Sequence, residues 1–326
     1  MQLYLYENFF IISELFILAF FLYVFCLQLI PSGGIKVKVN AYTFTYSLGL
    51  LTLISIIIQF ILVNTKLNLT WSIFNFAIQL TTITSWFFYL LIFSVIICLI
   101  FIIKINCVSF QQILKFEIFY LIVLCIIGGY FIILSNDLLT LFLALELYNF
   151  GLYIILGLNT NRIINTEITI KYFLISSLST ALIIFGISLI FGFTGILNLT
   201  DLSIFLINST QFNFPIILSI FFIMIGIFIK LGAAPFHFWS PDIYEGAANS
   251  VNIILLTLPK IILVGLLFKL FYSTFIFFSF TNTILFYLVI FSSFYFGTFG
   301  AIHQIKIKKF LTFSGISNLV SFLFLF

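Results

Sequence analysis

The sequence predicts an all-α fold, a polytopic transmembrane helical bundle of about ten spans. Of the 326 residues, 63% are hydrophobic and only 7% are charged. Apolar runs of about 20 residues recur along the chain, and a run of this length crosses a hydrocarbon core about 30 Å thick. The runs lack the alternation of a membrane β-strand, and backbone groups in lipid must be hydrogen-bonded internally. Helices are therefore expected rather than a barrel.

The apolar runs divide the chain into successive predicted spans. They lie at 8–30, 43–63, 82–103, 115–134, 137–157, 168–192, 214–234, 250–271, 284–304 and 311–326. The last run has about 16 residues, which is short for a full crossing, so the chain is expected to stop inside a membrane element. The longest polar connections fall near 193–213 and 235–249.

The basic residues predict the orientation of the bundle. Lysine or arginine follows spans one, three, five and nine, whereas the even-numbered loops offer little beyond Lys66 and Lys269. By the positive-inside rule, the odd loops face the cytoplasm or matrix and the N-terminus faces the other side. The loop after span seven carries Asp242 and Glu245 but no lysine, and the rule is silent about it.

Composition excludes several classes of function. The formal charge of +4 comes from scattered lysines, so no nucleic-acid partner is expected. The four cysteines show no zinc or CxxC spacing, and no dinucleotide or Walker motif is present. We therefore expect no cofactor or metal, and expect energy for transport to come from partner subunits or an ion gradient. The 48 phenylalanines beside one arginine are typical of an AT-rich genome, which favours synthesis in an organelle.

Three ionisable residues stand inside predicted spans: Glu146, Lys230 and Lys260. A charge at the centre of a span costs about 2.5 to 3.5 kcal/mol on insertion scales, so such residues usually face the bundle interior. One interpretation is a buried Glu146–Lys230 ion pair that only fixes helix packing, although desolvation often offsets such attraction. The other is one buried polar line that carries protons. Burial and pairing act in opposite directions on proton affinity, so alternating paired and unpaired states would load and release protons.

A predicted helix break follows Lys230. Pro235 cannot donate a backbone hydrogen bond, and Gly232 has low helix propensity. Freed backbone groups at membrane depth are tolerated where protein or a water-filled cavity covers them, which favours a hydrated path beside Lys230. An ordinary helix end at the membrane surface is the alternative. Trp239, beyond this break, is expected in an interfacial aromatic belt.

One pair of charges has a simpler interpretation. Glu167 and Lys171 are four residues apart at the start of a predicted helix. This spacing is typical of a surface ion pair worth a few tenths of a kcal/mol.

Several segments carry a resemblance. Residues 230–247 read KLGAAPFHFWSPDIYEGA, and further matches are DLLTLFLALELYNFGLYIILG from Asp137, IKYFLISSLSTALIIFGISLIFGFTG from Ile170, LPKI from Leu258 and IKKFLTFSGISNL from Ile307. In this order and spacing they resemble the subunit 2 family of mitochondrial NADH:ubiquinone oxidoreductase, respiratory complex I, and its bacterial counterpart. The first 110 residues contribute little beyond hydrophobicity.

The resemblance implies a proton-pumping, antiporter-like subunit with inverted five-helix repeats. Glu146 matches the family's glutamate of the fifth span, Lys230 the lysine of the broken seventh helix, Lys260 the lysine of the eighth, and Pro235 the break. It also implies an organisation into N-terminal transmembrane helices at 1–110, a first repeat at 111–272 and the start of a second repeat at 273–326. The expected location is the mitochondrial inner membrane, with the N-terminus on the intermembrane-space side.

The chain departs from the family at its C-terminal end. Family members continue for several spans, including a second broken helix with another lysine that completes the inverted repeat. Either the subunit is truncated, with an incomplete second repeat, or a separate chain supplies the missing helices. The expected partners are that separate chain, other complex I membrane-arm subunits and lipids. The alternative functions are a subunit of a multisubunit cation/proton antiporter and a structural membrane scaffold without transport.

Overall fold

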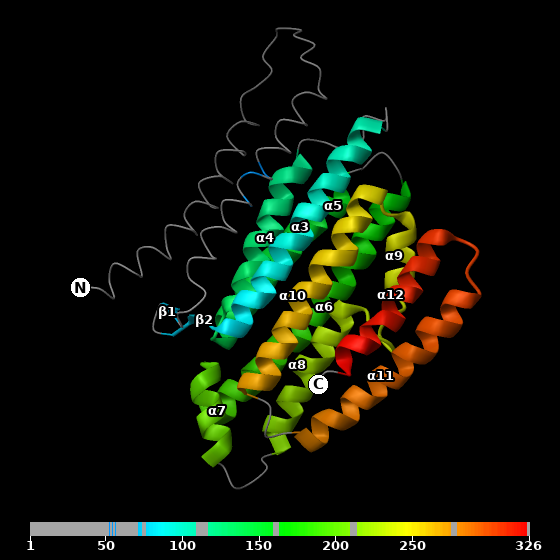
Figure 1. The fold of residues 1–326 in the computed structure, drawn as a ribbon. Helices are drawn as coiled ribbons and strands as arrows, with labels where there is room; N and C mark the ends of the chain where they lie inside the picture. The colour runs from blue at the N-terminus through cyan, green and yellow to red at the C-terminus, as the bar shows by residue number, and fades with distance from the viewer. Residues whose placement is uncertain are drawn as a thin grey trace.

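The computed structural model describes residues 52, 54, 56, 71–73, 76–108, 117–158, 163–208, 214–274 and 279–324. Long helices dominate this part of the chain and run roughly along one direction (Figure 1). Six contain a stretch long and apolar enough to cross a membrane: α3 (Thr82–Val108), α5 (Leu138–Gly157), α6 (Ile163–Thr194), α8 (Phe214–Leu231), α10 (Asn249–Ser273) and α11 (Ser279–Ile302). The protein is therefore a multi-pass membrane protein.

The predicted spans from 82–103 onward each coincide with a helix. The shorter helices among them are α4 (Glu117–Leu134) and α12 (Ile307–Leu323). The predicted spans 8–30 and 43–63 fall outside the described residues, apart from three isolated positions in the second. The described helices therefore correspond to eight of the ten predicted spans.

Three features differ from the prediction: a hairpin and two short helices. A short antiparallel hairpin pairs β1 (Trp71–Ile73) with β2 (Ile78–Leu80), so the all-α prediction is wrong in this detail. The connection predicted at 193–213 contains helix α7 (Leu199–Asn208). Its leucines at 199, 202 and 206 are buried, which is the spacing of one apolar helix face. The connection predicted at 235–249 likewise contains helix α9 (Ser240–Gly246). All three features are too short to register as apolar spans.

Glycines set the closest helix contacts around α8. A Cβ atom at Gly186 of α6 would lie 2.7 Å from the carbonyl oxygen of Ser219. A Cβ atom at Gly226 of α8 would lie 2.8 Å from the carbonyl oxygen of Ser179. Small residues at such crossings let membrane helices approach closely. These contacts fix α8, whose last turn carries Lys230, against α6.

Helices α11 and α12 form a pair at one side of the bundle (Figure 1). Gly297 of α11 packs against Ser317 of α12, where an added Cβ would lie 2.7 Å from the Ser317 nitrogen. Helix α12 also contacts α9 (Ser240–Gly246), the short helix after α8. Only 28% of the membrane-length stretch of α11 is buried, so most of that helix faces outward.

Candidate functional site

The end of α8 is built around Gly232. This residue has φ +67, and the backbone N–H groups of Gly232 and Ala233 donate to the carbonyls of Ile229 and Phe228 at 3.1 Å each. This pair of bonds, with a left-handed residue after the last helical one, is a Schellman motif, in which glycine avoids a Cβ clash. The helix therefore ends at Leu231, directly before Gly232 and four residues before Pro235, the two residues from which a break was predicted.

Trp239 closes the same end from the other side of the turn. Its indole N–H donates to the carbonyl of Ile229 at 3.0 Å. The ring lies beside Gly232, where an added Cβ would stand 3.3 Å from Trp239 Cζ2, and against Tyr172 of α6 with centroids 5.8 Å apart. Trp239 is only 8% exposed. The prediction that it belongs to an interfacial belt is therefore wrong, because its N–H caps a buried carbonyl.

The turn between α8 and α9 also contains Pro235. A cis peptide bond joins Ala234 to Pro235, and the hydroxyl of Ser292 on α11 donates to the Ala234 carbonyl at 2.8 Å. The backbone N–H of Phe236 donates to Ala233. Backbone groups released between the two helices are thus taken up by side chains and by the turn itself.

The ammonium of Lys230 stands in the last turn of α8. Its Nζ atom is buried and has no hydrogen-bond partner among the described residues. The charge of Glu146 on α5 acts on it, yet no ion pair within 4.0 Å joins these two described side chains. The structure thus brings Glu146 and Lys230 into electrostatic range without direct contact.

Further polar atoms on α5 are buried near Glu146 in sequence. The hydroxyl of Tyr148 and the Nδ2 atom of Asn149 have no hydrogen-bond partner within the described ranges. Tyr153 on the same helix also interacts electrostatically with Glu146. Its hydroxyl is hydrogen-bonded to the hydroxyl of Ser176 on α6. Buried polar atoms without protein partners are usually satisfied by ordered water. The run Glu-Leu-Tyr-Asn inside an apolar helix was the sequence signal for these groups, and it was missed.

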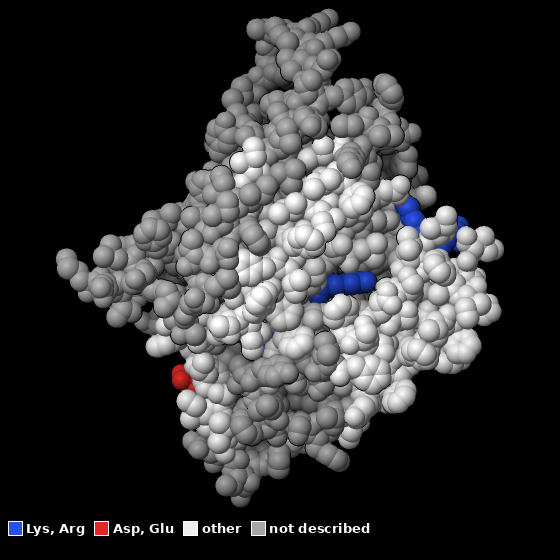
Figure 2. Space-filling model, in the orientation of Figure 1, with Lys and Arg blue, Asp and Glu red and all other residues white. Residues whose placement is uncertain are grey.

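Lys260 points to a different neighbour. It follows Pro259 inside α10, and its Nζ atom would lie 2.7 Å from a Cβ added at Gly315 of α12. The side chain is half-buried. Figure 2 shows basic side chains at two places on the side of the molecule in view. One place is midway along the bundle, where the ribbons of α10 and α12 meet in Figure 1, and the other is near the turn between α11 and α12. Lys260 is thus directed at α12 rather than at Glu146.

Lys269 corrects a prediction. It was taken as a charge of an even-numbered loop, but it lies within α10, is buried, and donates to the carbonyl of Ile133 at 3.2 Å. That carbonyl belongs to the last turn of α4. A cation at a helix C-terminus binds unpaired carbonyls and interacts favourably with the helix dipole. Lys269 and Lys260 are nine residues apart, so they leave α10 on opposite faces.

Charges gather at the end of the bundle where α9 meets α12. Lys306 pairs with Glu245, and Lys309 pairs with Glu245 at 3.0 Å and with Asp242 at 3.5 Å. Lys308 donates to the Ala247 carbonyl at 2.8 Å. Hydrogen bonds from Lys306 and Lys309 lower the pKa of Glu245, and the bond to Glu245 raises the pKa of Lys309. The loops after predicted spans seven and nine therefore lie at the same end of the bundle.

Two further findings concern the predicted surface ion pair and metal binding. The predicted ion pair of Glu167 and Lys171 is confirmed, with 2.6 Å between nitrogen and oxygen. Within the described ranges, no group of three or more His, Cys, Asp or Glu residues could hold a metal ion.

The chain has clear relatives in sequence. The NADH:quinone oxidoreductase/Mrp antiporter transmembrane family matches residues 135–325. NADH-quinone oxidoreductase subunit N of Bartonella bacilliformis is 34% identical over an alignment of 222 residues, and the match covers 65% of this chain and 45% of the relative. NADH-ubiquinone oxidoreductase chain 2 of Rhizopus oryzae is 40% identical over 202 residues, 61% of this chain and 38% of the relative. The chain thus spans less than half the length of these curated relatives.

Solved structures share the fold. A chain of respiratory complex I from Thermus thermophilus superposes with a TM-score of 0.74 at 19% identity, covering 94% of this chain and 62% of that one. A chain of the Mrp complex from Dietzia sp. gives a TM-score of 0.77 at 16% identity, covering 95% of this chain and 57% of that one. With the family match over more than half of its residues, the chain belongs to the NADH:quinone oxidoreductase/Mrp antiporter transmembrane family.

Proposed function

We propose that the chain is a proton-translocating membrane-arm subunit of NADH:ubiquinone oxidoreductase, with Glu146, Lys230 and Lys260 on the proton path. One observation carries this proposal. The ammonium of Lys230 is buried at the end of a membrane-length helix, and none of the described residues offers it a hydrogen bond. Intramembrane ionisable groups usually mark functional sites, because burial is costly without a use.

The arrangement supports reversible protonation. A buried ammonium that lacks a contact partner depends on a distant charge for its stability, and Glu146 supplies that charge. A change in the position or protonation of Glu146 would change the free energy of holding a proton at Lys230. The Tyr148 hydroxyl and the Asn149 Nδ2 atom lack hydrogen-bond partners among the described residues, and water bonded to them would carry the proton between Glu146 and Lys230. Lys260, directed at α12, is the next carrier in this scheme.

The architecture that accompanies this function is also a proposal. We take α8 and α9 as two halves of one broken membrane helix, with Gly232 and Pro235 in the break. The chain would comprise about ten spans, with helices at 1–110, a first antiporter-like repeat at 111–272 and the start of a second repeat at 273–326. The N-terminus would face the intermembrane space of mitochondria. The end that carries Lys306, Lys308 and Lys309 would face the matrix.

The subunit would itself carry no redox cofactor. NADH oxidation would occur on other subunits of the complex, and this chain would use the energy they release. The relatives' names include NADH-quinone oxidoreductase subunit N and NADH-ubiquinone oxidoreductase chain 2, which supports this assignment over a free-standing antiporter.

The test is proton translocation by the intact complex. Complexes with Lys230→Ala or Glu146→Gln should assemble, oxidise NADH and translocate fewer protons per NADH than the wild type. A structural scaffold predicts unchanged translocation in assembled complexes, and that result would refute the proposal.

The antiporter alternative makes a different prediction. The similarity in fold to the Mrp complex chain is the observation that favours it. An antiporter subunit would support cation-driven proton movement in vesicles without NADH. A proton pump of the respiratory complex would move protons only when NADH is oxidised, so vesicles with and without NADH separate the two.

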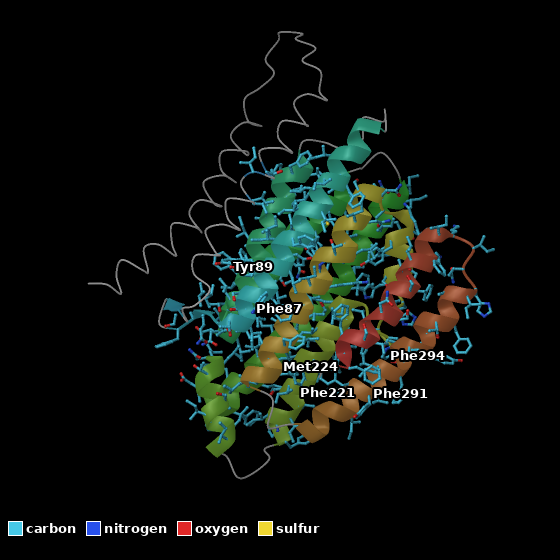
Figure 3. The ribbon with its side chains drawn as sticks, in the orientation of Figure 1. Phe87, Tyr89, Phe221, Met224, Phe291 and Phe294 are labelled. Atoms are coloured by element: carbon cyan, nitrogen blue, oxygen red, sulfur yellow. The ribbon has the colours of Figure 1, made fainter. Side chains whose placement is uncertain are left out.

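We propose that a separate membrane chain packs against the outer surface where α10 and α12 meet, which we call the α10–α12 face. Lys260 reaches this face half-buried at the middle of a span, and Asn318 of α12 is exposed. Facing lipid would be costly for both groups. Figure 3 labels Phe291 and Phe294 on α11, which are 69% and 58% exposed and lie outside the bundle's interior.

The intact complex decides whether that partner exists. Cross-linking from Cys introduced at Asn318, followed by mass spectrometry, should recover a second polypeptide with transmembrane helices. Recovery of lipid adducts alone, or of a longer form of this same chain, would refute a separate partner.

A further inference from the structure

The turn after α8 places one tryptophan donor on the carbonyl beside Lys230. The carbonyl of Ile229 already accepts from Gly232, and the indole of Trp239 adds a second bond from ten residues away. A carbonyl oxygen has two lone pairs, so both bonds can form at once. Since Lys230 follows Ile229 directly, the position of this peptide group sets where the lysine side chain begins.

Trp239 has few other positions open to it. Its ring fills the space left by the missing side chain at Gly232 on one side and meets Tyr172 on the other. Tyr172 also packs edge-on against Tyr153, the residue on α5 that feels the charge of Glu146. One continuous set of contacts thus joins the helix of Glu146 to the carbonyl next to Lys230.

A second side-chain hydrogen bond, from the hydroxyl of Ser292, also holds the turn after α8, but it restrains the turn less than the Trp239 bond does. Ser292 donates to the Ala234 carbonyl at 2.8 Å, but its single hydrogen can also go to Leu288 in its own helix at 2.7 Å. The indole N–H of Trp239 donates only to the Ile229 carbonyl among the described residues. Trp239 is therefore the stronger restraint on the turn.

We propose that Trp239 is a positioning residue, whose indole N–H holds the last turn of α8 so that Lys230 keeps its place relative to Glu146. This rests on the proposed proton path. The ring supplies packing, but the N–H supplies the restraint. Removal of the N–H should let the last turn of α8 fray and should disperse the lysine over several positions.

Two substitutions separate the N–H from the ring. Trp239→Phe keeps an aromatic ring and removes the donor. Trp239→His loses the benzene part of the indole, yet its Nε2 lies the same number of bonds from Cβ as the indole nitrogen. Trp86→Phe is the matched control, since Trp86 lies on α3 with 67% of its surface exposed.

The measurement is protons translocated per NADH by assembled complexes, taken at about pH 8, where an ordinary histidine is neutral. Because Trp239→Phe loses one hydrogen bond, its protons per NADH should fall about twofold to tenfold. The fall should be smaller for Trp239→His, and Trp86→Phe should match the wild type. A packing role predicts the reverse order, and that order would overturn the proposal. Failure of both Trp239 variants to assemble would assign the residue to packing and would overturn it too.

A Lys230→Ala complex measured alongside separates the two proposals. If Lys230→Ala stops translocation while Trp239→Phe and Trp239→His both match the wild type, only the role of Trp239 is wrong. If Lys230→Ala also leaves translocation unchanged, the proposed proton path is refuted, and the positioning role of Trp239 is refuted with it.

Discussion

The lysines of this chain occupy two contrasting regions. At the end of the bundle, Lys306 and Lys309 meet Glu245 and Asp242 in direct ion pairs, and the side chain of Lys306 is 68% exposed. In the interior, the ammonium of Lys230 is buried, and Glu146 acts on it from beyond contact distance. Lys306 and Lys309 are thus paired where water is near, whereas the Lys230 ammonium has no contact partner where water is scarce.

The difference separates two uses of charge. An exposed pair costs little to form and gains little, because water and salt screen it. It can hold α9 against α12 without affecting transport. A buried ammonium without a direct partner is a poor device for stability, because its desolvation is not offset by contact. The presence of a lysine at this buried position is better explained by the proposed reversible binding of a proton.

The largest effect should come from Lys230→Ala. Without the ammonium, the path between Glu146 and Lys260 has a gap, and protons per NADH should fall about tenfold or more in assembled complexes. The matched change at the other region, Lys306→Ala, should leave translocation at the wild-type value. Equal losses in both variants would erase the contrast between the two regions.

A smaller effect is expected at Gly315. An added Cβ would lie 2.7 Å from the Nζ atom of Lys260, so Gly315→Ala should displace the ammonium, the movable end of a flexible chain. Protons per NADH should fall about threefold, equivalent to less than 1 kcal/mol. The control is Gly192→Ala, since a Cβ there meets nothing within 4 Å. Wild-type translocation in Gly315→Ala would mean that Lys260 is not confined by α12.

Lys269→Met should affect stability rather than transport. The change leaves the carbonyl of Ile133 without its lysine donor, at a cost of about 1 to 3 kcal/mol. We expect thermal dissociation of the complex at lower temperature and unchanged protons per NADH in what remains assembled. A selective loss of translocation would place Lys269 on the proton path.

The smallest effect belongs to Glu245→Gln, which removes the ion pairs of a partly exposed carboxylate with Lys306 and Lys309, worth about 0.2 to 1 kcal/mol each. The pKa of Glu245 is lowered in the folded chain by Lys306 and Lys309. Its contribution to stability is therefore present above the ordinary glutamate pKa and is lost as pH falls through the lowered value. Wild type and Glu245→Gln should differ in thermal stability at neutral pH and converge in acid. A difference that grows toward acid pH would contradict this assignment.

The same ion pairs act on the alkaline side through Lys309. Its pKa is raised by Glu245, so its contribution is complete below the ordinary lysine pKa and is lost as pH rises through the raised value. Thermal melts of wild type and Lys309→Met should therefore converge in strong alkali. A gap that stays constant there would assign the effect of Lys309 to packing.

Local sequence was enough to place most helices and the interior charges. The membrane-length helices, together with α4 and α12, follow apolar runs, because a membrane span must be long and apolar whatever its neighbours are. Glu146, Lys230 and Lys260 stood out because a charge inside such a run is costly. The helix end after Lys230 was predicted as well, although Gly232 ends α8 before Pro235 is reached.

Contacts between distant segments could not be predicted in this way. Trp239 looked like an interfacial aromatic because its acceptor, the Ile229 carbonyl, is a backbone group across a turn. Lys269 looked like a loop charge because its partner lies on α4, 136 residues earlier in the chain. Charge and hydropathy report the cost of a residue's environment, but they do not identify the neighbour that meets that cost.

The central claim is that Glu146 and Lys230 act as one proton-handling unit. The most direct test measures protons per NADH in assembled complexes with Glu146→Gln, with Lys230→Ala and with both changes. Groups that act together lose little more when both are removed than when the worse one is removed, so the double variant should match Lys230→Ala. Independent, multiplying losses, or wild-type translocation in the Lys230→Ala complex, would contradict the account.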